Sequence, residues 1–170
     1  MKCLTPSEVD KWLSRHGHNS KADAVPVISF HAPTKFSVLE AFVECILRDI
    51  FIQGEVLLMV DDTDRERNGH LRVIKALRKL AGEKRTLDKS PVFLFAKDEW
   101  EHAVMLFSLN ACFYWKCYVW GDRDQLTLFN WEGEIFDVWA GNEKGRKAVL
   151  ELLKGFKLKR IIRRSKSRGK

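Results

Sequence analysis

The feature that most constrains the fold is an uninterrupted run of five apolar residues, Val56-Leu57-Leu58-Met59-Val60. The run is short, it follows Gly54 and it ends at an acidic stretch, which is typical of a strand rather than a helix. A strand that is apolar at every position has to be covered on both of its faces. We therefore expect residues 55–60 to form an interior strand of a sheet.

The flanking patterns predict that strands and helices alternate along the chain. Apolar side chains recur at helical spacing over residues 37–50, 71–80 and 98–113. Strand composition is found over residues 25–30 and 92–96. Helices that alternate with strands usually cross back over the sheet and leave the strands parallel. The sequence thus predicts an α/β fold, a three-layer sandwich with a mostly parallel central sheet of about five strands and flanking helices.

The C-terminal half is expected to contain a β-hairpin and a last helix. The hairpin joins residues 116–120 to residues 125–129 through a Gly-Asp-Arg-Asp turn. Asn130 is interpreted as the cap of a helix rather than the start of a third strand, because the apolar residues after it recur at a spacing near 3.6. Asn142 is expected to cap the last helix. Residues 1–156 are predicted to form one domain.

Basic residues are concentrated at the C-terminus. The chain has 170 residues and a formal net charge of +7, from 30 Lys and Arg against 23 Asp and Glu. Nine basic residues and no acidic ones lie within residues 154–170, which leaves 21 basic against 23 acidic residues in the rest of the chain. We expect residues 157–170 to be a flexible basic tail on a slightly acidic body.

Three roles are open for this tail. It could be a solvated extension without a ligand, a site for DNA or RNA, or a contact for an anionic membrane surface. The nucleic-acid interpretation assigns phosphate contacts to seven cations, Lys157, Lys159, Arg160, Arg163, Arg164, Lys166 and Arg168.

An acidic cluster, Asp-Asp-Thr-Asp-Arg-Glu over residues 61–66, directly follows the apolar run. Asp62 and Asp64, with Asp61 in support, could hold Mg²⁺ at the end of a strand. His31 could then act as a general base, and Lys35 could neutralise charge on a phosphate. The alternative is an ordinary helix start, because acidic residues there face the positive end of the helix favourably.

Two family resemblances bear on these residues. The stretch Val60-Asp61-Asp62-Thr63-Asp64-Arg65-Glu66 is similar to the strand-end Asp-x-Asp motif of Toprim domains in topoisomerases and primases, and residues 28–35 look like the first strand and turn of that family. This resemblance implies a Mg²⁺-dependent site that handles DNA, with Asp62 and Asp64 as metal ligands. Over residues 54–140 the chain also resembles small uncharacterised bacterial α/β proteins, which implies no activity.

Neither a targeting signal nor a membrane span is expected. No apolar run approaches the roughly 18–20 residues that a membrane-spanning helix requires, and the N-terminus turns polar at once. The four cysteines lack the paired short spacing of a zinc site and are expected to be reduced thiols. These features favour a cytoplasmic protein.

Aromatic residues are frequent in the C-terminal half, where five of the six tryptophans lie. Most of them have spacings that are compatible with a core, and some could instead form a patch for a partner.

Taken together, the patterns favour a non-catalytic binding or accessory module without a cofactor. Its body would bind a protein partner and its tail DNA or RNA. One alternative is a Mg²⁺-dependent phosphoryl-transfer or nuclease-like enzyme that uses the acidic cluster. Another is an inhibitor of the immunity or antitoxin type.

Overall fold

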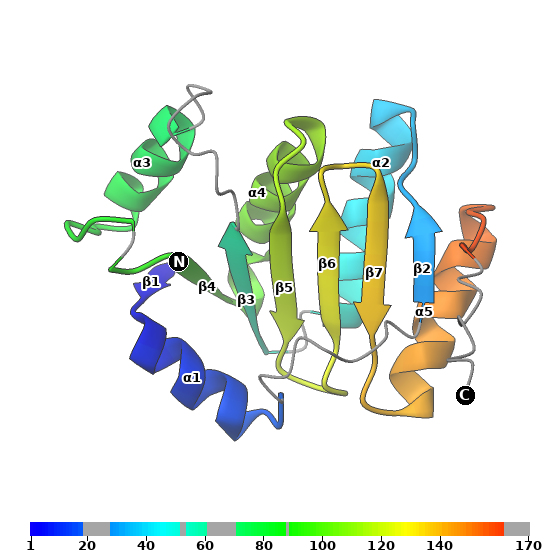
Figure 1. The fold of residues 1–170 in the computed structure, drawn as a ribbon, viewed down its shortest axis with the longest axis horizontal. Helices are drawn as coiled ribbons and strands as arrows, with labels where there is room; N and C mark the ends of the chain where they lie inside the picture. Colours follow the sequence, from blue (N-terminus) through cyan, green and yellow to red (C-terminus); the bar gives the residue numbers. More distant parts are fainter. Residues whose placement is uncertain (19–27, 52–53, 61–70, 88, 162–170) are drawn as a thin grey trace, which may run out of the picture.

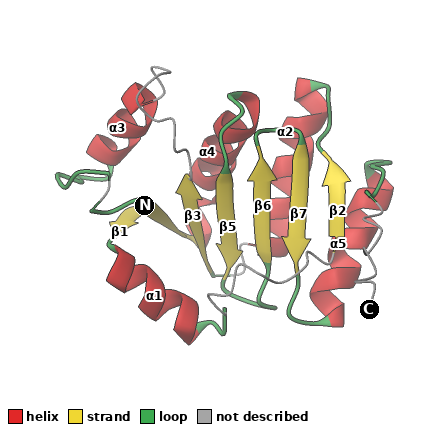
Figure 2. Ribbon diagram, viewed as in Figure 1, coloured by secondary structure: helices red, strands yellow, loops and turns green. Residues whose placement is uncertain are grey.

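The structure, a computed structural model, describes residues 1–18, 28–51, 54–60, 71–87 and 89–161. Within these residues a seven-stranded sheet forms the centre, in the spatial order β1-β4-β3-β5-β6-β7-β2 (Figure 1). The strands are β1 Lys2–Leu4, β2 Ile28–His31, β3 Glu55–Val60, β4 Val92–Ala96, β5 Cys117–Gly121, β6 Thr127–Trp131 and β7 Ile135–Trp139. Figure 2 shows the helices arranged around this sheet.

Every pair of neighbouring strands in the described sheet is antiparallel, so the prediction of a mostly parallel sheet is wrong. The reason lies in the connections. Helix α3 (Leu71–Leu80), between β3 and β4, lies beyond the β1 end of the sheet and does not cross back over it (Figure 1). The strands that flank helix α2 (Phe36–Cys45), β2 and β3, run in the same direction, but three other strands lie between them (Figure 1). A helical crossover gives a parallel pair only when its two strands are also neighbours in the sheet.

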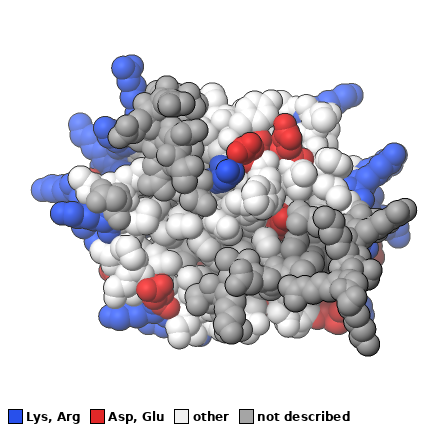
Figure 3. All heavy atoms as spheres, in the orientation of Figure 1, with Lys and Arg blue, Asp and Glu red and all other residues white. Residues whose placement is uncertain are grey.

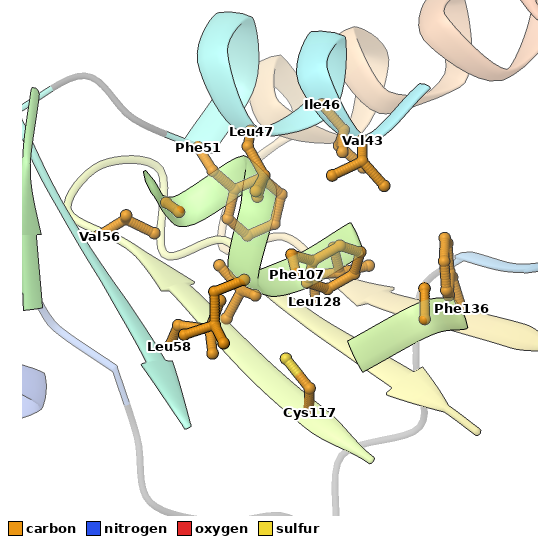
Figure 4. Packing of buried hydrophobic residues seen from close by; sticks show 14 of the residues in the cluster. Val43, Ile46, Leu47, Phe51, Val56, Leu58, Phe107, Cys117, Leu128 and Phe136 are labelled. Atoms are coloured by element: carbon orange, nitrogen blue, oxygen red, sulfur yellow. The ribbon is translucent and has the colours of Figure 1, made fainter. Parts of the chain in front are cut away.

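One face of the sheet is covered by α2, by the π-helical segment Ile46–Phe51 that continues it, by α4 (Trp100–Cys112) and by α5 (Glu143–Gly155). Figure 4 shows side chains of these helices above those of the strands. The labelled residues are Val43, Ile46, Leu47, Phe51 and Phe107 from the helices and Val56, Leu58, Cys117, Leu128 and Phe136 from the strands. No helix in the described ranges has both the length and the apolarity needed to cross a bilayer.

The opposite face is covered at its β1–β4–β3 end by helix α1 (Pro6–Arg15). This helix begins with a capping box, in which the Glu8 amide donates to Thr5 Oγ1 at 3.3 Å and the Thr5 amide donates to Glu8 Oε2 at 2.8 Å. Trp12 of α1 packs against Leu57, while Leu58 faces the other core. Both leucines are fully buried, so the expectation that β3 is covered on both faces is confirmed.

The predicted hairpin is confirmed as β5 and β6, but the helix predicted after Asn130 is wrong. β7 follows instead, through a tight turn in which Glu132 and Gly133 have φ angles of 51° and 73°. Asn130 Oδ1 accepts a 2.8 Å hydrogen bond from the Gly133 amide, and Asn130 Nδ2 donates a 2.9 Å bond to the Trp115 carbonyl. Asn130 therefore caps a chain reversal, with the same side-chain chemistry that caps a helix.

The start of the last helix, α5, agrees with the prediction from the sequence. Asn142 Oδ1 accepts a 2.9 Å hydrogen bond from the Gly145 amide, as expected for the cap of the last helix. Val149 and Leu153 of α5 enter the same core as α2 and α4.

Candidate functional site

The strand ends that were expected to build a catalytic site lie apart. His31 is the last residue of β2, Lys35 directly precedes α2, and both side chains are exposed. Since β5, β6 and β7 lie between β2 and β3, the position of His31 is about 19 Å from the end of β3 at the usual strand spacing of about 4.8 Å. Asp61, Asp62 and Asp64 lie outside the described residues.

Metal binding finds no geometric support among the residues that the structure describes. None of their His, Cys, Asp and Glu side chains come together in groups of three or more that could hold an ion. Cys3, Cys45, Cys112 and Cys117 are free thiols, as expected, and Cys3 and Cys117 are buried.

The first part of the predicted tail lies along the sheet. The Ile161 amide donates a 2.7 Å hydrogen bond to the Ser29 carbonyl, and Arg160 forms an antiparallel bridge with Phe30. β2 is the edge strand at this end, so residues 160 and 161 cover its open edge. Figure 3 shows Lys and Arg side chains on this side of the molecule and also on the opposite side. The tail cations Lys157 and Lys159 are exposed.

The other four tail cations of the nucleic-acid hypothesis, Arg163, Arg164, Lys166 and Arg168, lie outside the described residues. The described part of the tail ends at the β2 edge, beside α5.

A groove of about 610 Å³ lies between α2 and α4, which pack on each other. Its apolar lining includes three of the six exposed large apolar side chains of the described chain: Phe36 is 61% exposed, Met105 is 42% exposed and Phe113 is 46% exposed. Val104 and Leu109 contribute further apolar surface from α4. The groove is therefore an apolar surface on the outside of the helical layer.

Carboxylates line the same groove. Glu40 and Glu44 contribute from α2, and Glu101 contributes from the first turn of α4. Arg48 pairs with Glu44, and its guanidinium carbon lies 5.7 Å from the centre of the Trp100 ring. With one of the three carboxylates paired in this way, the groove remains negatively charged.

Two small side chains from α4 complete the lining. Ser108 is 9% exposed, and its Oγ is buried without a hydrogen-bond partner among the described residues. Cys112 lies one turn further along the helix, and the pKa of its thiol is raised by burial and by the charge of Glu40. Glu40 of α2 and Cys112 of α4 are thus neighbours across the groove. An unpaired buried hydroxyl costs about 1–3 kcal/mol, so a ligand that reached it would gain a favourable contact.

The aromatic residues divide between core and surface. Trp115 is 2% exposed and belongs to the core, as the spacing predicts. Phe113 and Trp131 are exposed, so the alternative of a surface patch describes them better. Tyr118, Phe129 and Trp131 form a row on β5 and β6, with centroid separations of 4.2 Å and 4.6 Å between successive rings.

Sequence reasoning missed the groove, although α4 carries a signal for it. The buried stripe of this helix contains Ala103, Leu106 and Phe107. Met105 and Leu109 are also apolar, yet they lie out of phase with that stripe. A helix that is apolar on two sides needs a second cover, and this pattern could have marked the groove side of α4.

In comparisons with known proteins, the chain matches no family model, no curated protein and no solved structure.

Proposed function

We propose that this chain is a non-catalytic binding module. Its body would hold a segment of a protein partner in the groove between α2 and α4, and its basic tail would add affinity for DNA or RNA. The observation that carries the proposal is the clustering of exposed apolar side chains. Six large apolar residues are exposed in the described part of the chain; Phe36, Met105 and Phe113 line this groove, and Tyr114 directly follows Phe113. Such a cluster is characteristic of an interface.

The shape of the groove suits a helical segment of the partner. Two packed helices present a long channel between parallel ridges of side chains, and an amphipathic helix can lay its apolar stripe into such a channel. Phe36 and Met105 stand on opposite sides of the groove, one on each helix. They would contact successive apolar residues of the bound helix.

The groove proposal can be tested with a displayed library of amphipathic helical peptides selected against the full chain. Peptides that use the groove should lose at least about tenfold in affinity on Met105→Glu, because a carboxylate would be buried in their apolar contact. Leu80→Glu is the matched control, since Leu80 is 82% exposed on α3, outside the groove. Selected peptides that bind both variants equally would refute the groove as their site.

The tail proposal rests on charge and on the position of its first residues. The Ile161 amide is bonded to β2 at one edge of the sheet, and the sequence after it contains the cations Arg163, Arg164, Lys166, Arg168 and Lys170. If four of them contact phosphates, log K for a single strand should fall against log salt with a slope of about −3.

This slope can be measured by fluorescence anisotropy with a labelled oligonucleotide. The full chain is compared with a chain that ends after Ile161, which keeps the backbone bond to Ser29. The truncated chain should lose both the affinity and the salt dependence. Equal binding by the two proteins would remove the tail from the proposed function.

A further inference from the structure

The two ends of the groove differ in chemistry. α2 and α4 run in opposite directions, so the start of α2 lies beside the end of α4 (Figure 1). Phe36 and Phe113 therefore flank one end, which is apolar. Glu44 and Glu101 flank the other end, where Arg48 lies over Trp100.

The middle of the groove is marked by polar groups. Glu40 stands on α2 between Phe36 and Glu44, one helical turn from each. Ser108 lies in the same part of the groove on α4, nine-tenths buried and with its hydroxyl unpaired within the described chain. The groove thus passes from an aromatic end, through the Glu40 carboxylate and the buried Ser108 hydroxyl, to an acidic end.

We infer that the partner segment is a helix with an apolar stripe and with Lys or Arg gathered at one end, and that its cationic end lies against Glu44 and Glu101. Its largest apolar side chain then lies between Phe36 and Phe113. The inference rests on the proposed function and adds the charge and the orientation of the partner. Charge complementarity carries it, because Arg48 pairs with only one of the three carboxylates in the groove.

The test uses three synthetic helical peptides that share one apolar stripe. The first carries four Lys at one end, the second carries the same Lys spread along the helix, and the third carries Glu in their place. Fluorescence anisotropy against the full chain should show the first peptide binding about fivefold to tenfold more tightly than the second, and the third binding most weakly.

Glu101→Lys should abolish the preference for the first peptide, whereas Glu151→Lys should keep it. Glu151 is an exposed residue of α5 that does not line the groove, so the two variants make the same change of charge. Both variants also keep the basic tail, so any attraction between the tail and the third peptide is the same in each.

The outcomes separate this inference from the proposed function. If all three peptides bind equally and all are lost on Met105→Glu, the groove is a docking site and the inferred charge of the partner is wrong. If no peptide binds in a way that depends on Met105, both proposals fail. A concentration-dependent dimer in sedimentation velocity that is lost on Met105→Glu would make a second copy the occupant and overturn the inference.

Discussion

The indole nitrogen of Trp131 donates a 2.8 Å hydrogen bond to the carboxylate of Asp137 within the β6–β7 hairpin. Asp137 is 1% exposed, so its carboxylate depends on donors such as this one. Trp131→Phe should therefore lower the free energy of unfolding by about 1–3 kcal/mol, because a buried charge loses a donor. A double-mutant cycle with Asp137→Leu, measured by urea unfolding, should give a coupling energy near 1 kcal/mol. Additive effects of the two substitutions would contradict the coupling.

Gly133 should tolerate alanine far less well than Gly82 does. The φ angle is 73° at Gly133 and 70° at Gly82, so an alanine at either position would adopt a left-handed backbone, which costs about 1–2 kcal/mol. At Gly82 a new Cβ meets no atom within 4 Å, whereas at Gly133 it would overlap the Ala111 carbonyl oxygen. Gly133→Ala should thus cost at least about 1 kcal/mol more than Gly82→Ala in thermal or urea unfolding. Equal losses would show that the β6–β7 turn can shift away from α4.

The hairpin also shows what local patterns could and could not predict. Most elements were placed correctly from capping residues and apolar spacing, among them β3, β4, α3 and the hairpin of β5 and β6. The strand β7 was missed because apolar side chains occupy both of its faces. Phe136 and Val138 face the helical core and Trp139 faces the other side, so the alternation is hidden. Strand direction was missed for a different reason, since it depends on which strands become neighbours.

The candidate site was less predictable than the fold. The exposed position of Met105 follows from the phase of α4, which the sequence contains. That Phe36 lies beside Phe113 does not follow, because the antiparallel packing of α2 on α4 joins segments almost 80 residues apart. The separation between the end of β2 and the end of β3 could not be predicted either, since it depends on the three strands that lie between them.

The stability of the fold should fall as the pH drops below about 6.5, in part through His18. Its Nε2 donates a 2.7 Å hydrogen bond to the Gly121 carbonyl, and its ring stacks on Trp12 at a centroid distance of 5.9 Å. Burial lowers the pKa of His18 below its usual 6.5, His16 adds to the lowering, and the bond to Gly121 opposes it. Because the unfolded chain then takes up the proton at a higher pH than the folded chain, acid favours unfolding.

This pH effect can be isolated by substitution. In urea unfolding at pH 7.5 and pH 5.5, His18→Phe should show a smaller loss of stability on acidification than the unmodified chain does. Other titrating groups are common to both proteins and cancel in the comparison. The same pH dependence in both would mean that His18 keeps its ordinary titration in the folded state.

Replacement of Arg78 should destabilise the fold even when the new residue is lysine. Its side chain is 4% exposed and donates to the carbonyls of Ser90, Arg85 and Thr86, the latter two at 2.7 Å and 3.0 Å, in the segment that leads into β4. The guanidinium reaches these acceptors because its donors lie in one rigid plane, whereas an ammonium cannot span them. Arg78→Lys should therefore lower the free energy of unfolding by at least about 2 kcal/mol. Arg72→Lys on the exposed side of the same helix should change it by no more than about 0.5 kcal/mol. Equal effects in urea unfolding would show that these carbonyls are satisfied without the planar side chain.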